Sequence, residues 1–130
     1  MRILIIDVCG AALDWALRCQ EYGHEIKWYI DKTKTEKKYN WVGTGLVPRV
    51  REWEPHMDWA DLIFLTDNVK HLDKLAYYFN RGYPIFGPTW EAANLELDRQ
   101  AGVEAFESVG IKTIPGQEFK SYAAAISYVK

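Results

Sequence analysis

The stretch that decides the fold is PIFGPTWEAANLELDRQAGVEAFESVGIK, residues 84–112. Its apolar start, residues 85–86, is typical of a buried strand, and the Gly-Pro pair at residues 87–88 breaks that strand. Thr89 is expected to cap a short helix. A second helix follows, and Gly110 is expected to end it in a left-handed backbone conformation. The apolar residues of the second helix recur at helical spacing, and they are Leu97, Ala101, Ala105, Phe106 and Val109.

The chain before this stretch alternates between short apolar runs and amphipathic segments. Each apolar run predicts a strand inside a parallel sheet, where both faces of the strand are covered. Strands are expected at residues 2–6, 24–30, 62–65 and 85–86, with a further short one near residues 46–47. Helices are expected at residues 12–22 and 69–79, with a short helix or turn at residues 50–59. The pattern predicts an α/β fold with about four parallel strands, in the order 3-2-1-4 or 2-1-3-4.

A last helix is expected near the end of the given sequence. An extended segment starting at Lys112 leads to Ser121, which is a good cap for a helix. The apolar residues of that helix, Tyr122, Ile126 and Val129, are expected to face inward.

Composition limits the classes of function. The 130 residues make one domain's worth of chain, and 16 basic against 18 acidic side chains give a net charge of -2. Proteins that bind nucleic acid by neutralising phosphates usually show a basic excess, so no nucleic-acid partner is expected. The basic cluster at residues 32–38 is interpreted as a solvated loop. Six Trp and eight Tyr residues indicate core and interface packing or, alternatively, a platform for stacking bases.

Cysteine and histidine usage suggests a cytoplasmic protein without a metal site. Cys9 and Cys19 follow a chain start that leads directly into a strand, without a signal peptide, so reduced and buried thiols are expected. No apolar run is long enough to span a bilayer, so no membrane association is expected. Metal-ligand spacing is absent among the three histidines, which are His24, His56 and His71.

The central stretch also resembles a known family. Its Gly-Pro-Thr turn is followed by Ala-Ala-x-Leu-Glu at residues 92–96, and a basic residue, Arg99, comes three positions later. The next helix ends in Gly-Ile, residues 110–111, directly before an extended segment. This succession is similar to the ATP-grasp ligases, and among them most similar to phosphoribosylamine–glycine ligase. The resemblance implies a Rossmann-like three-layer pre-ATP-grasp domain at residues 1–90, then a linker helix and the start of the ATP-grasp domain at residues 91–130.

The resemblance implies the N-terminal part of an ATP-dependent carboxylate–amine ligase, with an acyl-phosphate mechanism of the kind used in purine-nucleotide metabolism. ATP and magnesium would be bound mainly by ATP-grasp elements absent from the given sequence, so no catalytic residue is expected here. The chain is therefore expected to be an excised fragment or a natural short protein, inactive by itself. Expected partners are small-molecule substrates and either the remainder of a ligase chain or a second copy in a homodimer.

Two other classes of function stay open. One is a non-catalytic Rossmann-like module that binds a nucleotide or a partner. The other is a flavodoxin-like receiver domain, suggested by Asp7 at the end of the first strand, although the further acidic pair and the late lysine of such domains are not evident.

Arg99 is the candidate nucleotide-binding residue. The resemblance places it where ATP-grasp ligases hold the nucleotide phosphates, and a guanidinium suits that role because it offers planar, charge-assisted donors. The residues alone allow another interpretation, a solvated arginine paired with Asp98 or Glu96. Asp98 is itself expected near the start of a helix, where the helix dipole favours a negative charge.

Candidate substrate-binding residues follow the third and fourth strands. Ligands of open α/β sheets collect at the carboxyl ends of the strands. Thr66, Asp67 and Asn68 end the third strand, and they are expected to bind substrate or, alternatively, to cap the next helix. The turn after the fourth strand is expected to face a ligand with its amides or to be only a tight connection, and its residues are Gly87, Pro88 and Thr89.

The loop after the first strand departs from known phosphate-binding patterns. A dinucleotide-binding fold would carry Gly-x-Gly-x-x-Gly there, and the glycine ligase carries Gly-x-Gly-Gly-Arg-Glu-His-Ala. The matching stretch is DVCGAALD, residues 7–14, in which only Gly10 keeps the pattern, so Gly10 is the substrate-binding residue expected in this loop. Asp7 would repel a phosphate if it is ionised. The residues of this loop therefore do not specify the amine substrate of the implied ligase.

Overall fold

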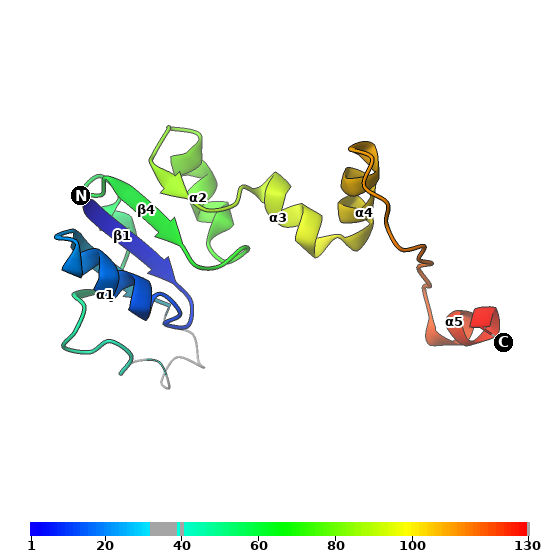
Figure 1. Ribbon diagram of the computed structural model, residues 1–130, viewed down its shortest axis with the longest axis horizontal. Helices are drawn as coiled ribbons and strands as arrows, with labels where there is room; N and C mark the ends of the chain where they lie inside the picture. The colour runs from blue at the N-terminus through cyan, green and yellow to red at the C-terminus, as the bar shows by residue number, and fades with distance from the viewer. Residues whose placement is uncertain (32–38, 40, 130) are drawn as a thin grey trace. The chain divides into compact units, whose positions relative to one another are not determined.

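The computed structural model of the protein describes residues 1–31, 39 and 41–129 (Figure 1). The predicted solvated loop at residues 32–38 lies outside the described residues. The chain forms two compact units, Met1–Ala93 and Asn94–Lys130. We call them the sheet unit and the helical unit. None of the helices among the described residues is long and apolar enough to cross a membrane.

The sheet unit is built on five parallel strands. They are β1 (Arg2–Asp7), β2 (Glu25–Ile30), β3 (Arg49–Val50), β4 (Leu62–Leu65) and β5 (Ile85–Phe86). Their order is β3-β2-β1-β4-β5, and every neighbouring pair is parallel. The α/β prediction is confirmed, and the four predicted strands follow the second of the two expected orders. The fifth strand, β3, forms at the sheet edge a few residues after the position expected for it.

Helices cover both faces of this sheet. α1 (Leu13–Glu21) packs on one face, and α2 (Leu72–Phe79) packs on the other together with the start of α3 (Trp90–Leu97). The alternation of side chains along β1 separates the two cores, because Ile3 and Ile5 face α1 whereas Leu4 and Ile6 face α2. The result is the three-layer arrangement that the resemblance implies.

Two large aromatic residues fill these cores. Trp28 is fully buried on the α1 face, and Trp53 is 1% exposed on the α2 face. Trp53 precedes a short 3-10 helix, η2 (Glu54–His56), which lies in the region where a short helix or turn is expected. In both cases the indole packs in the interior, as the packing interpretation of the aromatic residues requires.

Several details of the sheet unit differ from expectation. α1 ends at Glu21, one residue before the expected end, so Tyr22 is its C-cap residue and is 80% exposed. α2 begins at Leu72, so Val69 lies in the preceding loop and is 37% exposed. Cys19 is buried as expected, but Cys9 is exposed in the loop after β1.

The helical unit begins within α3. Asp98 caps α4 (Arg99–Ser108), where its carboxylate accepts hydrogen bonds from the amides of Gln100 and Ala101 at 3.0 and 3.1 Å. Leu97 therefore ends α3. The expectation from spacing that Leu97 belongs to the second helix is wrong. Gly110 has a φ of 80°, so the left-handed stop is confirmed.

The last helix, α5 (Tyr122–Val129), begins at its expected cap. The hydroxyl of Ser121 accepts a hydrogen bond from the amide of Ala124 at 3.2 Å. The expectation that three of its apolar residues face inward is wrong, because Tyr122, Ile126 and Val129 are 91%, 56% and 83% exposed. A helix in so small a unit has too few partner side chains within that unit to bury an apolar face.

Gly87 is required by a close approach and not by backbone conformation. A Cβ at this position would lie 2.5 Å from Cδ1 and 2.7 Å from Cγ of Leu65, which is a core residue of β4. We expect Gly87→Ala to lower the free energy of unfolding by about 1–3 kcal/mol, measured by urea denaturation, because the core is already filled. In a double-mutant cycle, combining it with Leu65→Ala should cost less than the sum of the two single changes. If the two changes in the free energy of unfolding were strictly additive, this would contradict a clash between Cβ of residue 87 and Leu65.

Candidate functional site

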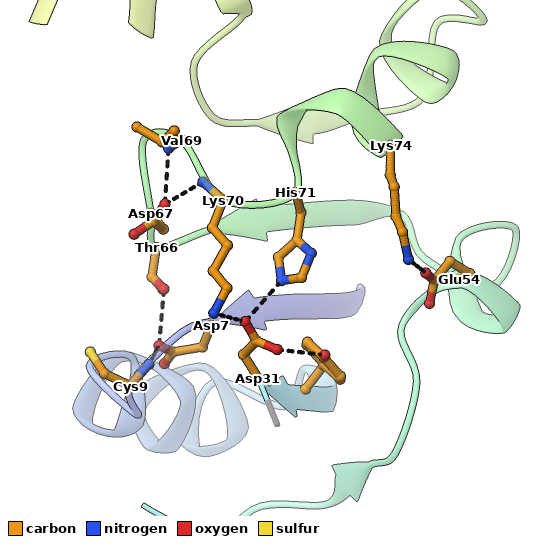
Figure 2. A network of polar contacts seen from close by, with 11 residues as sticks. Asp7, Cys9, Asp31, Glu54, Thr66, Asp67, Val69, Lys70, His71 and Lys74 are labelled. Atoms are coloured by element: carbon orange, nitrogen blue, oxygen red, sulfur yellow. Dashed lines mark hydrogen bonds and ion pairs between the residues drawn. The ribbon is translucent and has the colours of Figure 1, made fainter. Parts of the chain in front are cut away.

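Three polar side chains meet at the carboxyl edge of the sheet. Asp7 is the last residue of β1, Asp31 directly follows β2, and Thr66 directly follows β4. Because the strands are parallel and adjacent, these ends lie side by side, and Figure 2 shows them within one polar network. This edge is where open α/β sheets hold their ligands.

Asp7 is the most deeply buried member of this network, with no exposed surface. Its two carboxylate oxygens accept five hydrogen bonds between 2.9 and 3.2 Å. A buried carboxylate is tolerated only with such partners, so this arrangement is fully satisfied. The five donors are the amides of Cys9, Gly10 and Ala12, the indole nitrogen of Trp28 and the hydroxyl of Thr66.

Asp31 forms a second buried centre in the same edge. Its side chain is 10% exposed, and it accepts a hydrogen bond from the hydroxyl of Tyr29 at 3.1 Å. It also forms an ion pair with Lys70, and its Oδ2 lies 3.5 Å from Nε2 of His71 (Figure 2). Burial opposes ionisation of Asp31, but Lys70, Tyr29 and His71 together outweigh it and hold the pKa of Asp31 below its usual value.

His71 has an unusual backbone conformation. It caps α2 with a φ of 71°, and it is the single non-glycine residue with a positive φ in the described part of the chain. Its side chain is 14% exposed, and its ring meets the rings of Tyr29 and Trp53 edge-on, with centroids 5.9 and 6.0 Å away. Such conformations cost free energy and cluster at functional positions, so His71 is a site candidate.

Burial sets the protonation of His71. Desolvation lowers the pKa of His71, and the attraction of Asp31 does not compensate because Lys70 and Lys74 oppose it. The imidazole is therefore neutral at pH 7. Next to it lies a cavity of about 350 Å³, which is wide enough for a small molecule. Its wall includes the ion pair between Lys74 and Glu54, which are 2.8 Å apart.

The neutral state of His71 predicts a loss of stability in mild acid. The unfolded histidine titrates at about 6.5. Because the folded state has the lower pKa, the unfolded state binds more protons as the pH falls below that value. We therefore expect urea denaturation to give a free energy of unfolding that is highest above pH 6.5 and declines as the pH falls.

A variant separates His71 from the other histidine with a lowered pKa, His56. In a His56→Asn background, the further change His71→Asn should flatten this decline, and asparagine tolerates the left-handed conformation. A slope that is unchanged by His71→Asn would contradict the assignment.

The structure brings some of the predicted substrate residues together. Gly10 and Thr66 both donate to Asp7, so these two polar groups are already used within the protein. Asp67 accepts hydrogen bonds from the amides of Val69 and Lys70, at 2.9 and 2.5 Å. Asp67 therefore forms a turn before α2, close to the capping role that the sequence left open, and Asn68 is exposed in this turn.

The remaining predicted residues lie elsewhere. Thr89 is exposed and its hydroxyl accepts a hydrogen bond from the amide of Ala92 at 3.4 Å, so it caps α3, while Pro88 is partly buried beside it. Gly87 packs against Leu65. Arg99 belongs to the helical unit, where it is exposed and borders a cavity of about 520 Å³ between α4 and the extended segment after it.

Sequence reasoning did not identify Asp31, Lys70, His71 or Trp53 as site residues. The position of Asp31 directly after a buried strand was a usable signal, because a neighbouring strand end carries Asp7. The pairing of Asp31 with Lys70 and the left-handed backbone of His71 had no signal in the sequence.

The fold and the site edge define a Rossmann-like α/β protein with an all-parallel sheet. Over 98% of its length, the chain is similar to the crystal structure of N5-carboxyaminoimidazole ribonucleotide synthetase from Thermotoga maritima, with a TM-score of 0.72 and 14% sequence identity. The chain spans 36% of the length of that synthetase. At this identity the likeness is one of fold. No family model and no curated protein matches the sequence.

Proposed function

We propose that this chain is the N-terminal part of an ATP-dependent carboxylate–amine ligase of the ATP-grasp type. The observation that carries the proposal is the likeness of fold to a synthetase, which extends over 98% of the chain and so includes both the sheet unit and the helices after it. The succession from Gly87 to Ile111, which resembles ATP-grasp ligases, lies where one unit gives way to the other. Fold and motif therefore support the same class of enzyme.

The proposed reaction has two steps. A carboxylate oxygen of one substrate attacks the γ-phosphorus of ATP, the bond to ADP breaks, and an acyl phosphate forms. The amine nitrogen of the second substrate then attacks the acyl carbon, inorganic phosphate leaves with the bonding electrons, and the nitrogen loses a proton. Such phosphoryl transfer depends mainly on positioning and charge stabilisation. The sheet unit is proposed to position one small-molecule substrate at its carboxyl edge.

ATP and magnesium are proposed to bind mainly to ATP-grasp elements outside residues 1–130. Among the described residues, no group of three or more histidine, cysteine or acidic side chains is placed to hold a metal ion. Arg99 is the residue of this chain proposed to touch the nucleotide. Arg99 borders a cavity whose wall also includes Gln100 and Thr113, and a guanidinium is suited to phosphate oxygens.

The role of Arg99 is tested in the intact ligase. Arg99→Gln should weaken ATP binding about 10- to 100-fold, because a hydrogen bond to a charged phosphate contributes about 1.5–3 kcal/mol. Isothermal titration calorimetry with a non-hydrolysable ATP analogue measures this loss. Lys120→Gln is the matched control, since it removes an exposed positive charge from the same unit without touching that cavity. Equal affinities for Arg99→Gln and the unchanged enzyme would rule out a contact with the phosphates.

Positional isotope exchange tests the proposed class of reaction. The native gene product is incubated with ATP labelled with ¹⁸O at the bridging oxygen between the β- and γ-phosphates, together with one candidate carboxylate and no amine. Reversible formation of an acyl phosphate scrambles that label, so exchange is expected only with the true carboxylate. Bicarbonate and the free amino acids form the first panel.

The mass of the native gene product decides how a negative result is interpreted. A product clearly larger than the 15.1 kDa of this chain that shows neither exchange nor ADP release with any carboxylate would contradict a ligase. A product of about that mass would instead favour a non-catalytic module that binds a partner. Either measurement uses the protein as its source makes it.

A further inference from the structure

The loop after β1 is folded around an anion that belongs to the chain itself. The amides of Cys9, Gly10 and Ala12 converge on the carboxylate of Asp7, at 3.0, 3.0 and 2.9 Å. Gly10 has a φ of 84°, a left-handed conformation that contributes to this convergence. Consecutive amides that point to one spot form a concave site for an anion. In Rossmann-like folds, the same loop gives its amides to a ligand phosphate.

Two side chains from neighbouring strands close this anion site. The indole nitrogen of Trp28, in β2, donates to Oδ2 of Asp7 at 3.2 Å. The hydroxyl of Thr66, after β4, donates to Oδ1 at 3.0 Å (Figure 2). Asp7 has no exposed surface, so a ligand does not reach its oxygens. The three amides are already occupied by those oxygens. The loop therefore has the form of a phosphate-binding loop whose binding groups are already used.

A second position at which dinucleotide-binding folds contact their ligand is also occupied by contacts within the protein. Dinucleotide-binding folds place an acidic residue about 20 residues after the glycine loop, where it bonds the ribose. Asp31 stands at that place, at the end of β2 and 21 residues after Gly10. Its carboxylate is 90% buried and is held by Tyr29 and Lys70. Both polar positions that would recognise a nucleotide here are satisfied internally.

We propose that Asp7 is a built-in anion that replaces a bound phosphate in the loop after β1. Because Asp7 occupies the loop amides, this loop does not bind a phosphate group of a ligand. The part of a ligand that lies nearest the loop is therefore neutral or cationic. Assigning that ligand to a ligase rests on the proposed function, but the closure of the loop does not.

Amide spectra of the ¹⁵N-labelled full chain test this directly. Inorganic phosphate is titrated against sodium chloride of equal ionic strength. In the unchanged protein, the amide signals of Cys9, Gly10 and Ala12 should not respond to phosphate. In Asp7→Gly they should shift saturably with phosphate and with formate, and the melting temperature should rise with either anion, because an anion that binds only the folded state stabilises it. Saturable phosphate shifts at these amides in the unchanged protein would overturn the proposal.

Two further variants separate the anion role from a general loss of structure. Thr66→Ala removes one donor but keeps the Asp7 carboxylate, so its loop amides should ignore phosphate. Asp7→Asn keeps the size of the side chain, and its amide group should exclude phosphate while leaving the protein less stable. If Asp7→Gly does not fold in sodium chloride, its refolding is measured in formate and in phosphate, and either anion is expected to restore folding. Failure of both anions to shift the loop amides or to restore folding would show that Asp7 does not stand in for a phosphate.

The outcome does not depend on the isotope-exchange test of the ligase. A closed loop in a protein without exchange would leave the present inference standing and remove the proposed function. Isotope exchange in a protein whose loop binds phosphate would support the proposed function and overturn the inference of a built-in anion.

Discussion

Replacing Asp7 with alanine should lower the free energy of unfolding of the sheet unit by about 3–5 kcal/mol, because each buried donor left unsatisfied costs about 1–3 kcal/mol. The change leaves five donors without their acceptor. Those of Ala12 and Trp28 are buried and the other three are partly buried, and a buried polar group without a partner is costly. These donors come from the loop after β1, from β2 and from the segment after β4, so the loss affects the junction of three strands. Urea denaturation followed by tryptophan fluorescence measures it.

Asp14→Ala is the matched control for this prediction. Asp14 lies in α1 next to the same loop, but its side chain is 84% exposed, and its ion pair is with the exposed Arg18 one turn later. We expect its removal to change the free energy of unfolding by less than about 0.5 kcal/mol. A similar small change for Asp7→Ala would mean that the five hydrogen bonds contribute little, and it would also weaken the inference of a built-in anion.

Replacing Trp53 with alanine should cost about 3–5 kcal/mol, because it removes a large buried ring and leaves a cavity. Trp53 is 1% exposed, and its ring meets those of His71 and Tyr78 edge-on, with centroids 6.0 and 5.7 Å away. It therefore holds η2 against the start of α2 and forms one wall of the candidate cavity. The free energy of unfolding from urea denaturation measures the loss.

The same variant should also change the titration of His71. Without the indole, water reaches the imidazole, and desolvation no longer lowers the pKa of His71 as strongly. The pKa measured by NMR should move up toward its ordinary value. Trp41→Ala is the control, because Trp41 is 73% exposed. In this variant neither the free energy of unfolding of the protein nor the pKa of His71 should change appreciably. An unchanged His71 titration in Trp53→Ala would contradict the role of burial.

The polar network also separates the two leading classes of function. A nucleotide-binding Rossmann-like module would need the loop amides and the acid after β2 for its ligand. Here Asp7 occupies the amides, and Lys70 and Tyr29 hold Asp31. A module of this kind would therefore bind a partner rather than a nucleotide at this edge. The proposed ligase needs no nucleotide there, since Arg99 and elements outside the chain are assigned that role.

Much of the fold was readable in the amino-acid sequence because its signals are local. Apolar runs such as 62–65 predicted the buried strands, and β4 has these bounds. Residues whose preferences act through their own backbone, such as Asp98 at a helix start and Gly110 at a helix stop, behave as predicted. Parallel pairing follows from strands that alternate with helices, so the sheet order was already limited to two possibilities.

The candidate site was only partly readable, because its partners come from distant parts of the chain. Thr66 was identified from its place at a strand end, but its bond to Asp7 joins residues 59 positions apart. The pairing of Asp31 with Lys70 and the left-handed backbone of His71 depend on how the segment after β4 passes over β2. No local preference encodes such contacts.

The amino-acid sequence by itself therefore determined four of the five strands, the helix caps at Asp98, Gly110 and Ser121, and the parallel α/β class, because hydrophobic period and capping act over a few residues. Only the tertiary structure decided what the polar residues at the sheet edge do. Asp7 looked in the sequence like a charge that repels a phosphate, and in the folded protein it occupies the amides that a phosphate would need. The reason is physical: a buried carboxylate must find donors, and the folded chain alone decides which donors reach it.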